Sequence, residues 1–157
     1  MKIKLLVIGK TDDKNLGQLI EKYQQRLNHY VNFEIEIIPD IKNVKNLNQV
    51  QQKEKEGELI LSKLKNTDQL VLLDEKGKEF RSLDFASYLQ KKMNSGIKQL
   101  VLVIGGPYGF SESVYKKSTG KVSLSKMTFS HQMIRLFIVE QLYRGFTILK
   151  NEPYHHE

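Results

Sequence analysis

The sequence predicts an α/β fold, with a mostly parallel sheet sandwiched between helices. Short apolar runs alternate with longer amphipathic segments along the 157 residues, which is the order that strand–helix–strand crossovers require. The length, the 39% of hydrophobic residues and the lack of a linker or repeat indicate a single domain over residues 1–157. No run approaches the ~20 apolar residues of a membrane span. We therefore expect a cytoplasmic protein.

The first part of the chain supplies two strands and the helix between them. Residues 3–8 form a continuous apolar run that ends at Gly9, which is typical of a buried parallel strand. Residues 15–30 place apolar side chains at helical spacing and predict an amphipathic helix. Residues 33–38 alternate apolar side chains with glutamates and stop at Pro39, which indicates a strand with one solvated face.

The middle of the chain repeats this pattern. A long charged helix is expected over residues 46–65, and a strand over residues 69–73. We expect the chain to turn away from this strand at residues 74–77. A helix follows over residues 82–93, with Ser82 as its cap.

The last third contains the most apolar strand, residues 100–104, which runs into a glycine-rich loop at residues 105–109. A short helix is expected from Ser111 and a short strand over residues 122–124. The final helix should run from residue 130 to residue 146. Five strands and five helices therefore alternate along the chain.

Three loops are the expected place for a ligand, because ligands of open parallel sheets bind beyond the carboxyl ends of the strands. These loops follow Leu73, span residues 105–109 and span residues 125–129. The glycines allow backbone to approach a ligand closely. However, the loop has neither the G-x-G-x-x-G spacing of a dinucleotide site nor a following Gly-Lys-Ser/Thr. These residues leave open a nucleotide-like ligand or a plain tight turn.

The charge balance favours an anionic partner. The chain has 25 Lys and Arg against 18 Asp and Glu, a net charge of +7, which makes nucleic acid a candidate partner. The alternative is a solubilising surface, because most of these cations are Lys and they are spread evenly along the chain. The absence of Cys excludes disulfide scaffolds, thiolate zinc sites and Cys-nucleophile enzymes.

The final helix is apolar on almost every side, so it must be covered on most of them. It lies either at the centre of the chain's own fold or in a dimer interface, and we favour the dimer. His131 with Arg135, and Glu140 with Arg144, are spaced four residues apart, so each pair shares a helix face. Arg suits phosphate binding and base stacking, whereas Glu140 and Arg144 could form a purely structural ion pair.

The tail at residues 153–156 reads Pro-Tyr-His-His. Termini of this kind are often frayed. Tyr and His side chains are also suited to stacking on a base or to moving a proton, and composition alone favours the frayed end.

Six segments, taken in this order, resemble the ribosomal RNA large subunit methyltransferase H family within the SPOUT, or α/β-knot, methyltransferases. They are residues 53–57, 73–78, 103–109, 124–131, 139–144 and 153–155. The resemblance covers the whole chain. Members of the family commonly carry Pro where this chain has Ser130, and we expect little consequence because Ser can cap the helix that Pro would begin.

The resemblance implies a homodimer that transfers a methyl group from S-adenosylmethionine to N3 of a pseudouridine in large-subunit (23S) ribosomal RNA. It also implies a trefoil knot in the C-terminal part of the fold, although chains rarely thread through their own loops. No metal or membrane is implied. Two alternatives remain: a methyltransferase of the same fold that acts on another RNA such as tRNA, and a non-catalytic module that binds nucleotide or RNA.

The resemblance also implies roles for particular residues. The cofactor-binding residues would be Leu73, Gly105, Leu124, Ser125, Lys126, Met127, Thr128 and Phe129. The catalytic residues would be Tyr154, His155 and Arg135, and the RNA-binding residues would be His131, Arg135 and Arg144. Methyl transfer from a sulfonium needs positioning and electrostatics rather than an enzyme nucleophile. The acceptor nitrogen must lose its proton, which calls for a base or a stabilising cation.

Overall fold

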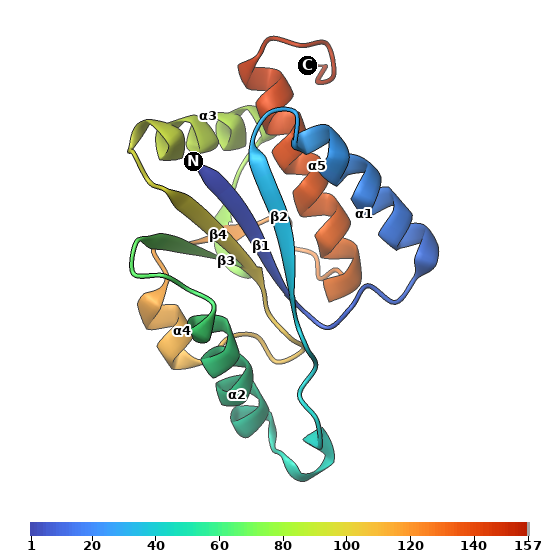
Figure 1. Ribbon diagram of the computed structural model, residues 1–157, viewed down its shortest axis with the longest axis vertical. Helices are drawn as coiled ribbons and strands as arrows, with labels where there is room; N and C mark the ends of the chain where they lie inside the picture. The colour runs from blue at the N-terminus through green and yellow to red at the C-terminus, as the bar shows by residue number, and fades with distance from the viewer. Residues whose placement is uncertain (157) are drawn as a thin grey trace.

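The computed structural model describes residues 1–156 (Figure 1). Its elements follow in the order β1 (Lys2–Ile8), α1 (Lys14–Leu27), β2 (Asn32–Ile38), the 3-10 helix η1 (Val44–Asn46), α2 (Gln49–Ser62), β3 (Asp68–Glu79), α3 (Ser82–Asn94), β4 (Gln99–Ile104), α4 (Glu112–Lys117), β5 (Gly120–Ser123) and α5 (His131–Leu149). The predicted alternation of strands and helices is confirmed.

The strands form one sheet in the order β2-β1-β4-β3-β5, and every neighbouring pair is parallel. Helices α1, α3 and α5 pack on one face, where they share a core with side chains of the sheet. Helices α2 and α4 cover the other face around a second core that includes Ile60 and Val114. Because both faces are covered, the central strand β4 is almost wholly buried, whereas the edge strand β2 keeps glutamates that are only partly buried. The predicted α/β fold with a sandwiched sheet is confirmed.

Strand β3 corrects one prediction. It does not turn away at residues 74–77 but continues to Glu79, because Lys78 and Glu79 resume pairing with β5 after an irregularity in the ladder. Gly77 makes this possible: a Cβ at that position would lie 2.7 Å from backbone atoms of Val122. Pairing with a strand more than forty residues later in the sequence overrides the local turn signal.

Several helix boundaries differ from the predictions by up to three residues, and α1 and α2 both end three residues before their predicted ends. The cap of α3 is Arg81 rather than Ser82, and its side chain makes no capping hydrogen bond. Helix α5 continues to Leu149, beyond the predicted end at residue 146. Ser130 does cap α5, because its Oγ accepts a hydrogen bond from the backbone N–H of Met133 at 3.1 Å.

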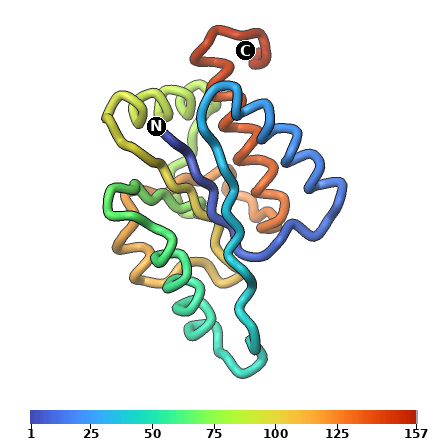
Figure 2. The backbone as a smooth tube through the Cα atoms, in the orientation of Figure 1, coloured from blue at the N-terminus to red at the C-terminus, as the bar shows by residue number. Residues whose placement is uncertain are grey.

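Helix α5 lies in the middle of its layer, between α1 and α3 (Figure 2). Ile138, Val139 and Leu142 are fully buried, and Gly145 allows close packing against Leu89 of α3. The apolar character of α5 is therefore satisfied largely within the chain, the alternative that we did not favour. A dimer interface on its remaining surface stays a prediction, as does the trefoil knot.

None of the helices formed by residues 1–156 is both long enough and apolar enough to cross a lipid bilayer.

Candidate functional site

The candidate site is a cavity of about 550 Å³ at the carboxyl ends of β4 and β5, beside residues 73–76 of β3. This volume lies within the range of small-molecule sites. The structure brings together here the three segments that the strand-end rule singled out, although the first of them is part of β3 and not a loop. The predicted cofactor residues that line the cavity are Leu73, Gly105, Leu124, Ser125, Met127, Thr128 and Phe129. Lys126 points away from it: its side chain is 84% exposed and lies 3.8 Å from the carboxylate of Glu79.

Carboxylates on the β3 side form a polar wall of the cavity. The hydroxyl of Tyr115 donates a hydrogen bond to Asp74 Oδ2 at 2.6 Å, and the hydroxyl of Thr128 donates one to Glu75 Oε2 at 3.2 Å. Burial, together with the Asp74 carboxylate, raises the pKa of Tyr115 to about 12. Tyr115 therefore remains a hydrogen-bond donor at neutral pH and fixes the position of Asp74.

The glycine loop is packed tightly on its outer side. A Cβ on Gly105 would lie 3.1 Å from the ring of Phe110, and a Cβ on Gly106 would lie 2.6 Å from Oε1 of Glu56. Gly109 has φ +79°, a conformation that other residues rarely adopt, and its N–H donates to the carbonyl of Gly106. At its three glycines the loop brings backbone to the cavity, and Pro107 and Tyr108 line the cavity beside them.

The opposite loop, residues 123–129, is held by its own serines. The hydroxyl of Ser123 donates to the backbone carbonyl of Ser125 at 2.9 Å, and Ser125 Oγ accepts from the backbone N–H of Met127 at 3.0 Å. These short-range bonds fix the path of the loop between β5 and α5. In residues 1–156 no group of three or more His, Asp or Glu side chains is arranged to hold a metal ion.

Of the two basic residues expected near the start of α5, the structure brings only His131 to the cavity. His131 is exposed and lines it. Arg135 is only 2% exposed: it donates to the backbone carbonyl of Ile8 at 2.7 Å and to Thr11 Oγ1 at 3.2 Å. Burial lowers the pKa of Arg135, against the opposing effect of nearby carboxylates. This placement gives Arg135 structural contacts, and its expected roles in catalysis and RNA binding stay predictions.

The tail residues gather at the other end of α5. Arg144 donates from Nε (3.1 Å) and Nη2 (2.5 Å) to Glu140 Oε1, so the structural ion pair that the spacing allowed is present. The guanidinium of Arg144 also lies 4.7 Å from the ring centre of Tyr154 and 3.2 Å from Nδ1 of His155. The hydroxyl of Tyr154 donates to Glu140 Oε1 at 2.9 Å. Tyr154 and His155 are therefore docked against α5 rather than frayed.

The tail cluster and the cavity lie apart within one chain. Arg144 comes thirteen positions after His131 in the helix, which corresponds to roughly 20 Å along α5. Figure 1 shows the C-terminus at the end of the molecule opposite to the carboxyl ends of the strands. The predicted catalytic residues Tyr154 and His155 thus do not line the cavity of their own chain.

The sequence alone did not identify Glu56 as a neighbour of the site. Its side chain is only 4% exposed and faces Gly106 from α2. The signal available was the segment over residues 53–57, which carries part of the family resemblance but had no assigned role.

Comparison with known proteins agrees with this geometry. The family described as predicted SPOUT methyltransferase matches residues 1–155. Relatives that carry the name ribosomal RNA large subunit methyltransferase H include the protein of Flavobacterium johnsoniae, 72% identical over 157 residues, and that of Parabacteroides distasonis, 66% identical over 157 residues. A third, from Porphyromonas gingivalis, is 56% identical over 157 residues. Each alignment covers 100% of both chains. The chain therefore belongs to the SPOUT methyltransferase family.

Proposed function

We propose that this protein transfers a methyl group from S-adenosylmethionine to large-subunit ribosomal RNA, at N3 of a pseudouridine in 23S rRNA. One observation carries the proposal: the strand-end cavity is lined by a glycine loop and the loop over residues 123–129, in a chain that matches rRNA methyltransferase relatives along its full length. A cytoplasmic location follows from a ribosomal substrate.

The residues of the cavity fit S-adenosylmethionine. Leu73, Leu124 and Phe129 offer apolar surface to an adenine ring, and the Gly105 backbone is open to hydrogen bonding. Asp74 and Glu75 place carboxylate oxygens at the cavity wall, where they are suited to accept hydrogen bonds from ribose hydroxyls. The bound cofactor supplies a methyl group already activated by its sulfonium, so the protein's task is to position and to desolvate.

The acceptor nitrogen forms its bond to the methyl carbon as the carbon–sulfur bond breaks, and it must give up its N3 proton. His131 lines the cavity and is one candidate to take that proton or to stabilise the negative charge that it leaves. Burial, together with hydrogen bonds to Tyr23 and Glu140, raises the pKa of Tyr154. Tyr154 is therefore a neutral donor at physiological pH, suited to holding a base rather than to deprotonating it. His155 is the remaining candidate in the tail.

We also propose the homodimer. Tyr154 and His155 lie at the far end of α5 from the cavity of their own chain. In a dimer, the tail of one copy could instead reach the cavity of the other. The exposed Met133 leaves apolar surface on α5 for such a contact. Two chains at +7 each give about +14, which favours phosphate-rich RNA.

Labelled methyl transfer tests the proposal. The protein is incubated with methyl-labelled cofactor and, in separate reactions, free 23S rRNA, large subunits, assembled ribosomes or tRNA. We expect methyl label in large-subunit RNA. We also expect calorimetry to show that the protein binds S-adenosylmethionine. Label only in tRNA would favour the second methyltransferase hypothesis. If the protein neither bound S-adenosylmethionine nor transferred label to any RNA, a non-catalytic module would be favoured.

A further inference from the structure

A buried carboxylate, that of Glu56, lies behind the glycine loop over residues 105–109. Glu56 is only 4% exposed and comes from α2, on the sheet face opposite to α5. Its carboxylate faces Gly106, where a Cβ would lie 2.6 Å from Oε1 and closer still to Oε2. The next residue, Gly57, packs in the same way against Ser111, the cap of α4. These two neighbours on α2 therefore support both ends of the loop that runs from β4 to α4.

The carboxylate of Glu56 is only half satisfied. Gln52 Nε2 donates to Oε1 at 3.2 Å, whereas Oε2 has no hydrogen-bond partner within the described chain, residues 1–156. A buried oxygen without a partner is costly, and such groups are retained where they serve a function. A hydrophobic side chain would fill this space at lower cost, so packing alone does not account for Glu56.

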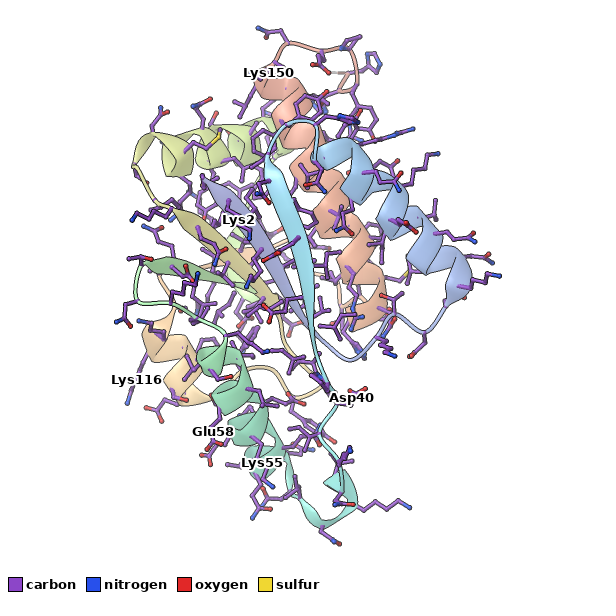
Figure 3. The ribbon with its side chains drawn as sticks, in the orientation of Figure 1. Lys2, Asp40, Lys55, Glu58, Lys116 and Lys150 are labelled. Atoms are coloured by element: carbon purple, nitrogen blue, oxygen red, sulfur yellow. The ribbon has the colours of Figure 1, made fainter. Side chains whose placement is uncertain are left out.

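The groups that bear on the charge of Glu56 come from three elements. Burial raises its pKa most, and the negative charge of Asp40, just after β2, raises it further (Figure 3). Gln52 on α2 and His131 at the start of α5 oppose this rise. Gly106, which the Glu56 carboxylate faces, lines the cavity together with His131, so Glu56 lies directly behind the cavity wall.

We propose that the Glu56 carboxylate gives the cofactor cavity a preference for a positively charged sulfonium over its uncharged thioether product. The inference rests on the proposed cofactor. S-adenosylmethionine carries a positive charge at sulfur, whereas S-adenosylhomocysteine does not, and the two otherwise differ by one methyl group. Asp74 and Glu75 also line the cavity, but they are half-buried and exposed respectively, so solvent screens them more than it screens Glu56. Glu56 would thus be a positioning residue that favours substrate binding and product release.

Calorimetric binding of the two compounds tests this. Wild type is compared with Glu56→Gln, which keeps the shape and removes the charge, and with Glu58→Gln, the same change at an exposed position of α2 (Figure 3). At about pH 8, where carboxyl groups are ionised, Glu56→Gln should reduce the preference for S-adenosylmethionine roughly tenfold. The loss should fall on S-adenosylmethionine, and Glu58→Gln should match wild type.

Two further measurements separate charge from structure. In wild type, the preference should weaken as pH falls and Glu56 takes up a proton, whereas Glu56→Gln should lack that component. Glu56→Asp keeps the charge and should retain most of the preference, with folding checked by thermal denaturation. An equal loss of affinity for both compounds, or no loss, in Glu56→Gln would overturn the inference. If wild type bound neither compound, the proposed cofactor itself would be wrong and the inference would fall with it.

Discussion

Arg135 donates a hydrogen bond of 2.7 Å to the backbone carbonyl of Ile8 and so ties the first turns of α5 to the carboxyl end of β1. A second bond reaches Thr11 in the loop that leads to α1. Because the guanidinium is only 2% exposed, it fixes the position of the helix that forms one side of the cavity.

Replacing Arg135 should therefore reduce stability. Arg135→Met leaves the Ile8 carbonyl without its side-chain donor, and the free energy of unfolding should fall by about 2–3 kcal/mol. Urea denaturation measures the change in the free energy of unfolding. Arg135→Lys is the control, because it keeps a positive charge but loses the planar guanidinium group with its several donors. A Met variant that is as stable as wild type but cannot methylate RNA would contradict this structural account and favour a catalytic or RNA-binding role for Arg135.

The tail should matter for turnover and not for the cofactor. Tyr154→Phe and His155→Ala change groups that lie away from their own cavity, so calorimetric affinity for S-adenosylmethionine should stay close to that of wild type. The methylation rate should fall by roughly 100-fold in His155→Ala if that residue moves the proton. Turnover that survives both changes would mean that the tail is a docked chain end without a catalytic part.

The pH dependence of Tyr154→Phe gives a separate test. The pKa of Tyr154 is raised, so its hydroxyl remains protonated as pH rises from neutral into the mildly alkaline range. The Phe variant should be slower than wild type by the same factor across that range. If a limb of the wild-type pH–rate profile disappeared in the variant, Tyr154 would be titrating and would act as a base.

Gly106 should not tolerate a side chain. Gly106→Ala drives a Cβ into the carboxylate of Glu56, so the loop or Glu56 must move. We expect affinity for S-adenosylmethionine to fall roughly tenfold, the equivalent of about 1.4 kcal/mol. Gly120→Ala is the matched control, because a Cβ there meets nothing within 4 Å. Equal affinities for the two variants would show that the close contact between Gly106 and Glu56 does not determine the conformation of the glycine loop.

Much of the site was accessible from the sequence because it depends on strand ends. Apolar runs mark the strands, and parallel strands place their following loops at one edge, so the sequence pattern alone locates Leu73 and Gly105. The burial of Arg135 was not predicted, for a different reason. Its spacing from His131 shows a shared helix face, but which part of α5 faces β1 depends on packing against α1 and α3, which local spacing does not encode.

The same limit explains Glu56 and β3. Glu56 meets Gly106 only after α2 has docked beside the loop that follows β4, fifty residues later in the chain. The extension of β3 to Glu79 likewise depends on β5. Both are non-local contacts between segments whose own patterns are those of an ordinary charged helix and an ordinary turn.

The proposed function depends above all on which atom receives the methyl group. The most direct measurement is nucleotide-level mapping of label from S-adenosylmethionine in large-subunit RNA, followed by mass spectrometry of the modified nucleoside. We expect a single labelled site, a pseudouridine methylated at N3, in reactions with wild-type protein. Label confined to tRNA, or to a different atom or nucleotide of large-subunit RNA, would contradict the proposal.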